Sequence, residues 1–341
     1  MQAHNLVIHD VTGAMHPEIR CVIFGRLFEH PLRIRHFAGG LYMQLPEQVT
    51  IIEVGPRDGL QNEKSLIPTE VKIDFIHKLK LAGLQEMELT SFVSPKWVPQ
   101  MKDAKEIITS CLDSTRNIVL APNRKGIERL YDTKCKAVAV FVGVSESFNK
   151  KNINKTTTES MEELKPVIKE LKSKGYFVRA CISTAFYCPY EGKVDEEAVL
   201  KLCSTFVQYG VDELSVADTI GKATPKDVFS LFSKLKKELS NILMTAHFHD
   251  TRGMALANVI AALQAGVNRF DTSAGGLGGC PFAPGATGNV ATEDVVYMLE
   301  EMGIQTGLEL SKLVEAVDVI KPYLTRPIES KYYRLQSANQ E

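Results

Sequence analysis

Apolar runs rich in β-branched residues alternate with amphipathic stretches along most of the chain. From residue 49 onward the apolar runs predict eight strands, at Val49–Gly55, Gln85–Thr90, Asn117–Asn123, Ala137–Ser145, Val178–Thr184, Asp212–Asp218, Leu243–Asp250 and Arg269–Gly275. Helices are predicted between them, among them Thr69–Ala82, Thr157–Lys174, Glu196–Tyr209, Thr224–Leu239 and Gly253–Ala265, and after them at Thr292–Met302 and Gly307–Tyr323. Eight such βα units predict an α/β chain folded as a closed (β/α)8 TIM barrel with extra C-terminal helices, rather than a doubly wound sheet.

One folded domain is expected over residues 43–330, because no linker or low-complexity run interrupts the pattern there. Residues 331–341 are expected to be a tail. We interpret residues 1–42 as a leader or an over-extended gene start that is poorly ordered. This segment has several arginines, as transit peptides do, but it also contains acidic residues and no serine, which is unusual for a transit peptide.

The composition is that of an ordinary globular protein, and it excludes several classes of partner. A net charge of −1 gives no support for a nucleic-acid-binding surface. No apolar run reaches the roughly 18–20 residues of a membrane helix. The seven cysteines are odd in number and form no C-x-x-C pair, which favours a reducing compartment over disulfides or a structural zinc site.

Two histidines end the seventh predicted strand, in the sequence Ala246-His247-Phe248-His249-Asp250. Side chains two residues apart on a strand point to the same face, so His247 and His249 could bind one divalent metal. The alternative is a pair of surface or core histidines placed by chance.

Other polar residues also fall late in the predicted strands, where the active sites of TIM barrels lie. Arg57 and Asp58 follow the first strand, Glu88 lies late in the second and Asp218 ends the sixth. Asp58 could add a carboxylate to the two histidines, and Arg57 suits an oxyanion; the alternative for this pair is a plain turn. Arg179, early in the fifth strand, fits this placement less well.

A glycine-rich segment, Gly275 to Pro281, follows the eighth strand and contains Cys280. It is either a flexible linker or a mobile lid that carries a reactive thiol. Asn289, further along, could supply an amide oxygen to the metal. Two imidazoles, a carboxylate and an amide favour Mg²⁺ or Mn²⁺ over zinc and leave Cys280 free for proton transfer.

Several motifs resemble the 3-hydroxy-3-methylglutaryl-CoA (HMG-CoA) lyase family, over about residues 45–325. They are Glu53–Glu63, Thr90–Pro99, Lys150–Asn154, Cys188–Gly192 and Gly276–Pro281. Arg-Asp and His-x-His alone would fit the wider metallolyase barrels, including isopropylmalate and homocitrate synthases. The glycine-flanked cysteine resembles the lyase in particular.

The resemblance implies a divalent-metal-dependent carbon–carbon lyase that acts in leucine degradation or ketone-body formation and cleaves HMG-CoA to acetyl-CoA and acetoacetate. It implies metal ligands Asp58, His247, His249 and Asn289, and catalytic residues Cys280, Arg57, Glu88 and Asp218. The implied substrate-binding residues are Arg57, Gln61, Lys151, Asn152 and Arg179, with Lys151 and Asn152 toward the coenzyme A arm. The acceptor of the hydroxyl proton stays open among Asp58, His247 and Glu88.

Some positions differ from the animal members of the family. Cys181 stands where a tyrosine is expected, Thr184 where a cysteine is expected, Ala217 where a glycine is expected and Arg252 where a tyrosine is expected. These differences favour a bacterial type of sequence and therefore a cytoplasmic protein. Separately, we expect a homo-oligomer, a dimer, with no nucleic-acid or membrane partner. The mitochondrial matrix is the alternative if residues 1–42 are a transit peptide. The competing functions are a related barrel lyase or acyltransferase on another 3-hydroxyacyl-CoA or 2-oxo acid, and a non-catalytic binding barrel.

Overall fold

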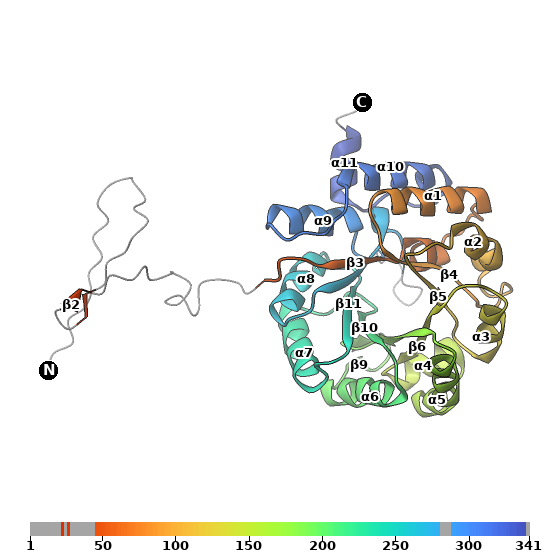
Figure 1. Ribbon diagram of the computed structural model, residues 1–341, viewed down its shortest axis with the longest axis horizontal. Coiled ribbons are helices and arrows are strands. Elements are labelled where there is room, and N and C mark those ends of the chain that lie inside the picture. The colour runs from red at the N-terminus through yellow and green to blue at the C-terminus, as the bar shows by residue number, and fades with distance from the viewer. Residues whose placement is uncertain (1–21, 24–25, 28–44, 280–287, 339–341) are drawn as a thin grey trace. The chain divides into compact units, whose positions relative to one another are not determined.

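The computed structural model describes residues 22–23, 26–27, 45–279 and 288–338 (Figure 1). The chain divides into two compact units, Met1–Gln44 and Leu45–Glu341. Within the described residues, the first unit contains one short antiparallel pair, β1 (Val22–Ile23) with β2 (Arg26–Leu27). Most of the predicted leader therefore lies outside the described residues.

The second unit is built on a closed barrel of parallel strands. In chain order these are β3 (Thr50–Glu53), β4 (Glu86–Ser91), β5 (Arg116–Leu120), β6 (Ala137–Gly143), β7 (Phe177–Ser183), β10 (Glu213–Asp218), β11 (Leu243–Phe248) and β12 (Arg269–Thr272). β12 pairs with β3 and closes the barrel. The predicted TIM barrel is confirmed, and each predicted strand contains or overlaps an observed one.

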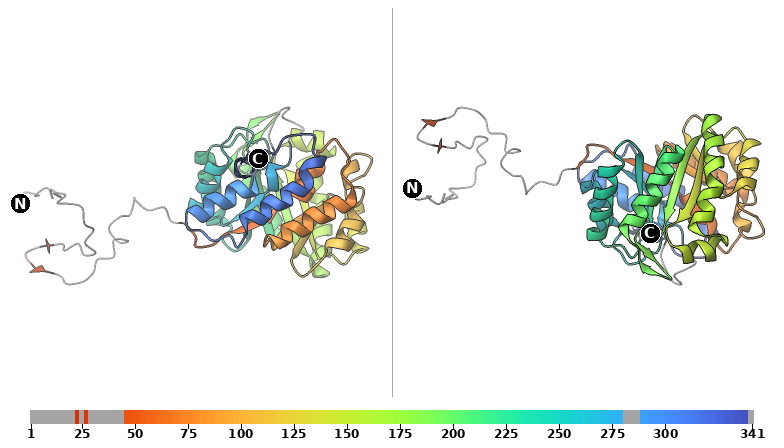
Figure 2. Two further views of the ribbon diagram at one scale, coloured as in Figure 1. Left: turned by 90° about the horizontal axis from the view of Figure 1, so that it is seen from above. Right: turned by 90° about the horizontal axis from the view of Figure 1, so that it is seen from below.

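Helices form the outer layer around the barrel (Figures 1 and 2). They are α1 (Thr69–Leu81), α2 (Ala104–Cys111), α3 (Arg124–Tyr131), α4 (Glu146–Ile153), α5 (Thr157–Ser173), α6 (Glu196–Tyr209), α7 (Pro225–Glu238), α8 (Ala255–Gln264), α9 (Thr292–Glu301), α10 (Leu310–Ile320) and α11 (Lys331–Ala338). A small hairpin, β8 (Tyr187–Cys188) with β9 (Gly192–Lys193), lies between β7 and α6 in sequence. No described helix has the length and apolar character needed to cross a membrane.

Local sequence explains where several helices begin and end. Thr156 caps α5 in a reciprocal capping box with Glu159, and Thr224 caps α7 in the same way with Asp227. Gly210 ends α6 with a φ of 93°, a left-handed conformation that glycine adopts without steric cost.

The segment predicted as a tail contains α11, which packs against α9. Asp294 on α9 accepts hydrogen bonds from the backbone N–H groups of Lys331 and Tyr332, at 3.0 and 2.8 Å, and from the Ser330 hydroxyl. Tyr333 is buried and donates to Asp318 at 2.5 Å. These contacts order a short helix that the sequence pattern alone does not predict.

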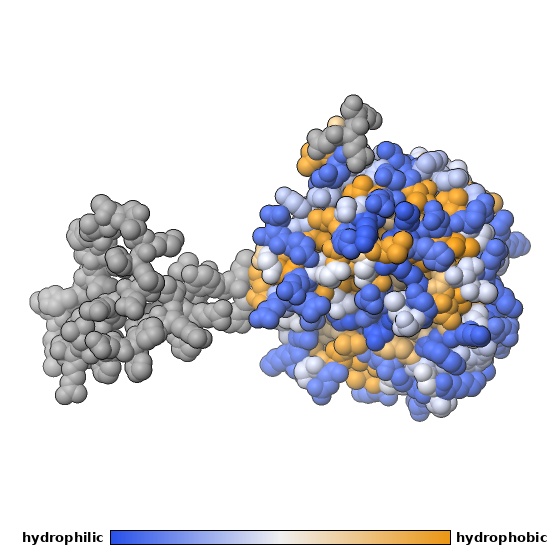
Figure 3. All heavy atoms as spheres, turned by 45° about the horizontal axis from the view of Figure 1, so that its top comes forward, coloured by the Kyte–Doolittle hydropathy of each residue, from blue (hydrophilic) through white to orange (hydrophobic). Residues whose placement is uncertain are grey.

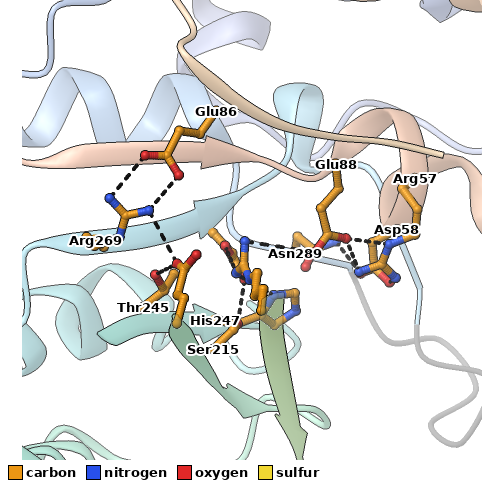
Figure 4. Close-up of polar contacts among 12 residues, drawn as sticks. Arg57, Asp58, Glu86, Glu88, Ser215, Thr245, His247, Arg269 and Asn289 are labelled. Carbon is orange, nitrogen blue, oxygen red and sulfur yellow. Dashed lines mark hydrogen bonds and ion pairs between the residues drawn. The ribbon is translucent and has the colours of Figure 1, made fainter. Parts of the chain in front are cut away.

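The barrel interior contains both apolar and charged side chains. Ile52, Ile118 and Ala139 belong to a small apolar cluster inside the barrel, distinct from the large core between strands and helices. Charged pairs are also present, among them Arg269 with Glu86, which are the first residues of β12 and β4 (Figure 4). The surface of this unit in Figure 3 mixes hydrophilic residues with small apolar patches.

Candidate active site

Three metal-donor side chains meet at the carboxyl ends of the strands. His247 lies on β11, His249 follows it, and Asp58 lies on the π-helical turn η2 (Gly55–Gly59) after β3. One donor atom from each residue lies within 4.8 Å of the others, and the two imidazole centroids are 5.3 Å apart. The structure therefore brings together three residues from distant segments that the sequence analysis proposed as metal ligands.

The backbone of η2 directs Asp58 toward the histidines. The Asp58 amide donates to the Val54 carbonyl at 2.7 Å, and the Gly55 amide donates to the buried Glu53 carboxylate at 2.7 Å. These bonds hold a tight turn at the end of β3. Asp58 is thus placed by strand geometry and not by a free loop.

Asn289 completes the group. It pairs with His249 through an isolated backbone bridge, and its amide nitrogen donates to Asp58 at 2.9 Å (Figure 4). Its amide oxygen and the Nδ1 atom of His249 are buried without a hydrogen-bond partner among the described residues. Buried polar atoms are normally paired, so two unpartnered atoms beside a carboxylate fit a cation site.

The charges around Asp58 favour its ionised form. Burial alone would raise the pKa of this carboxyl, but Arg57, His247 and His249 outweigh burial and lower it to about 2. Burial, together with the neighbouring His247, lowers the pKa of His249 to about 4. A carboxylate and an uncharged imidazole are the forms in which these residues bind a metal.

Arg57 lies beside the cluster and is held by two acids. Its Nε and Nη2 atoms contact the Oε2 atom of Glu88 at 2.6 and 2.5 Å, and Nη1 contacts Asp58 at 2.5 Å (Figure 4). Burial would lower the pKa of Arg57, but the charges of Glu88 and Asp58 raise it above its usual range. Within the described residues, three of its five N–H groups have protein partners, which leaves two for a substrate oxygen.

The cluster opens into a cavity of about 800 Å³. Its lining includes four residues that the sequence analysis proposed as substrate-binding: Arg57, Gln61, Lys151 and Asn152. Lys151 and Asn152 come from α4, and the Lys151 ammonium lies 3.7 Å from the centroid of the Tyr190 ring. The cavity wall therefore includes both the metal-donor group and a lysine side chain.

Four of the selected residues that the structure describes do not line the cavity, and Asn289, placed above beside Asp58, is one of them. Arg179 is completely buried and pairs with Asp271, so it lies inside the barrel and not at a substrate-facing position. Asp218 accepts the backbone N–H groups of Lys222 and Ala223, at 3.0 and 2.9 Å, and burial raises its pKa to about 6. Glu88 is buried behind Arg57.

Cys280 lies outside the described residues. The preceding residue, Gly279, lines the cavity, and its carbonyl accepts a hydrogen bond from Asn62 at 3.1 Å.

One buried acid in contact with the site was missed by the sequence reasoning. Asp271 on β12 lies 3.0 Å from the Nδ1 atom of His247. The sequence did contain a signal for this residue. Arg269 and Asp271 are charged residues at alternate positions of a strand, and Phe270 between them is in the core.

A closed parallel barrel with a metal-donor cluster at its carboxyl end defines the chain as a TIM barrel with a candidate metal centre. Residues 48–320 match the HMGL-like family. The chain belongs to this family.

Named relatives agree with this assignment. The chain is 46% identical over 292 residues to hydroxymethylglutaryl-CoA lyase YngG of Bacillus subtilis, covering 85% of this chain and 97% of the relative. It is 47% identical over 289 residues to the mitochondrial hydroxymethylglutaryl-CoA lyase of Homo sapiens, covering 84% of this chain and 89% of the relative. It superposes with a TM-score of 0.81 on an HMG-CoA lyase of Acinetobacter baumannii in complex with coenzyme A and 3-methylmalate, at 36% identity, covering 84% of this chain and 95% of that chain.

Proposed function

We propose that the protein is a divalent-metal-dependent carbon–carbon lyase that cleaves HMG-CoA to acetyl-CoA and acetoacetate. The observation that carries this proposal is the group of Asp58, His247 and His249 at one end of a cavity whose wall also includes Arg57. The names of the relatives support the substrate. The reaction would belong to leucine degradation or ketone-body formation.

In this reaction the bond between C2 and C3 of the acyl group breaks. The tertiary hydroxyl loses its proton and becomes the ketone of acetoacetate, while the bonding electrons form the enolate of acetyl-CoA. Mg²⁺ or Mn²⁺, held by Asp58, His247, His249 and Asn289, would supply Lewis-acid polarisation of that hydroxyl. The two N–H groups of Arg57 that have no described protein partner are suited to the thioester oxygen, where negative charge develops.

Two proton transfers complete the cleavage. The hydroxyl proton needs an acceptor that faces the cavity, which favours Asp58 over the buried Glu88. His247 is less suited, because one ring nitrogen would bind the metal and the other faces Asp271. The enolate carbon then needs a proton, and Cys280 is our candidate donor because of its position in the sequence next to cavity-lining Gly279. Glu88 would act by holding the Arg57 guanidinium in place.

We propose that the coenzyme A arm lies toward Lys151 and Asn152, where a cation and an amide suit its phosphates. The related function, cleavage or condensation with another 3-hydroxyacyl-CoA or 2-oxo acid, is less favoured because the named relatives are HMG-CoA lyases. We also propose a homodimer in the bacterial cytoplasm, with the mitochondrial matrix as the alternative. The single folded domain expected from residue 43 onward would extend past residue 330 to include α11.

The test is to incubate the purified full chain with HMG-CoA and assay acetoacetate. We expect acetoacetate to form, to stop after EDTA treatment and to return with Mg²⁺ or Mn²⁺. No acetoacetate with either metal would overturn the proposed substrate. Equal turnover before and after complete metal removal would overturn the metal-dependent mechanism.

A further inference from the structure

Asp271 lies inside the barrel, directly behind His247. The Asp271 side chain is almost completely buried on β12, and its Oδ2 atom is 3.0 Å from the Nδ1 atom of His247. The same Oδ2 atom accepts a hydrogen bond from the Ser215 hydroxyl at 2.8 Å. Arg179 contacts both Asp271 oxygens from β7. Residues from three neighbouring strands therefore converge on one carboxylate.

This arrangement determines which nitrogen of His247 carries the proton. A carboxylate only accepts hydrogen bonds, so Nδ1 of a neutral His247 must be the protonated, donating atom. The Nε2 atom then keeps the lone pair that a metal requires. The Nδ1 atom of His249, in contrast, has no hydrogen-bond partner among the described residues.

The carboxylate itself has little freedom to move. The Arg179 side chain is fully buried and spans the barrel interior to reach Asp271. Ser215 fixes the very oxygen that faces the imidazole. Since each partner is anchored on a different barrel strand, rotation of Asp271 would break a buried ion pair, which is costly.

We propose that Asp271, clamped by Arg179 and Ser215, is a positioning residue that holds His247 in its metal-binding tautomer. Partners of this kind behind a metal-ligating histidine typically change metal affinity by about 10- to 100-fold. The inference rests on the metal site in the proposed function, but not on the identity of the substrate.

The barrel offers a matched control one layer toward the amino-terminal ends of the strands. Glu213 on β10 is also fully buried, contacts an arginine (Arg269, at 3.3 Å) and accepts from a hydroxyl (Thr245). Its hydrogen-bond and ion-pair partners in the described structure include no histidine. Asp271→Asn and Glu213→Gln each remove one buried carboxylate charge beside an arginine, but only the first touches a metal-donor residue.

The experiment is a Mn²⁺ titration of the full chain followed by electron paramagnetic resonance, with thermal unfolding measured on the same samples. We expect Asp271→Asn to raise the Mn²⁺ dissociation constant by about 10- to 100-fold, and Glu213→Gln to leave it within about twofold. Wild-type affinity in Asp271→Asn, or an equal loss in Glu213→Gln, would overturn the proposal.

A second measurement reads the tautomer directly and does not require metal. The protein is labelled with ¹⁵N-histidine, and long-range ¹H–¹⁵N spectra are recorded without metal, with His247→Gln used to assign the His247 signals. The spectra should show the Nδ1-protonated form of His247; the Nε2-protonated form would refute the inference.

A second variant covers the case in which Asp271→Asn does not fold. Ser215→Ala removes one hydrogen bond to the same Asp271 oxygen and should weaken Mn²⁺ binding by a smaller factor; wild-type Mn²⁺ affinity in Ser215→Ala would overturn the proposed role of Ser215 in holding Asp271. Failure to cleave HMG-CoA with normal Mn²⁺ binding would reject the substrate and leave this inference intact.

Discussion

Arg57 and Glu88 form an ion pair at the end of the barrel, with Nη2 and Oε2 2.5 Å apart. The arginine lines the cavity, whereas the glutamate lies behind it on β4 and is only 1% exposed. The acid is therefore in a position to orient the guanidinium without meeting substrate.

Glu88→Gln should lower kcat more than it raises KM. The amide cannot hold the guanidinium as firmly, and a loosened donor stabilises the developing oxyanion less well; removing one such donor typically costs about 100- to 1,000-fold, so we expect a loss of up to about 100-fold. Steady-state kinetics with HMG-CoA measure both constants. Glu86→Gln, at the other end of β4, is the control, because Glu86 pairs with Arg269 and Arg116 outside the cavity. An equal kcat loss in both variants would contradict the role of Glu88.

Cys280→Ala should lower kcat by about 100- to 10,000-fold, the usual contribution of one proton-transfer group. Mn²⁺ affinity should stay at the wild-type value, since the thiol is not needed as a ligand. Stopped-flow or steady-state assays measure kcat, and a Mn²⁺ titration followed by electron paramagnetic resonance measures the metal affinity. Unchanged turnover would rule out the role assigned to this thiol.

Two buried carboxyls at the start of the glycine-rich segment should make stability depend on pH. Burial raises the pKa of Glu293 to about 8 and that of Glu53 to about 7. Both values exceed the ordinary glutamate value of about 4.3 expected in the unfolded chain, so the folded state binds more protons between about pH 4.5 and pH 8. The free energy of unfolding should therefore fall as pH rises through this window.

Glu293→Gln isolates this effect, because an amide resembles the protonated acid in shape and does not ionise. Urea unfolding at several pH values should show a flatter dependence in the variant than in the wild type. The difference in the free energy of unfolding should be largest at and above about pH 8, because the wild-type stability falls across the whole window and levels off once Glu293 is ionised in the folded state as well. Parallel pH profiles for the two proteins would show that Glu293 does not titrate with folding.

Helix α11 should contribute to the stability of the barrel domain, although residues 331–341 were expected to be a tail. Tyr333→Ala removes a buried ring and its hydrogen bond to Asp318, so it should lower the free energy of unfolding by about 3 kcal/mol. Leu335→Ala on the same helix is the control, since Leu335 is 60% exposed and should change stability by less than about 0.5 kcal/mol. Equal effects in denaturant unfolding would mean that α11 does not pack as described.

The sequence predicts the barrel well because its signals are local. Parallel strands buried on both faces give apolar runs, and the helices between them give amphipathic stretches, as in β6 and α5. The shared face of His247 and His249 follows from the strand period, and their rim position follows from their place at the end of the predicted strand. The closeness of Asp58 follows from the rule that strand ends meet at one face of a barrel.

Other features depend on contacts between distant segments and leave a weak local signal. Arg179 and Asp218 were both selected as candidate site residues. In the structure, Arg179 forms an ion pair with Asp271, and the Asp218 carboxylate accepts hydrogen bonds from the backbone that follows it. The start of α11 depends on hydrogen bonds to Asp294, 37 residues earlier for Lys331. The sequence pattern of residues 331–338 gives no indication of this contact with Asp294.

The central claim is that Asp58, His247 and His249 share one divalent ion. Anomalous X-ray diffraction from crystals grown with Mn²⁺ tests it most directly, because the scattering locates the ion without reference to activity. We predict one strong peak within bonding distance of all three side chains, and its loss in His249→Ala. A peak elsewhere in the barrel, or none at the three residues at saturating Mn²⁺, would contradict the account.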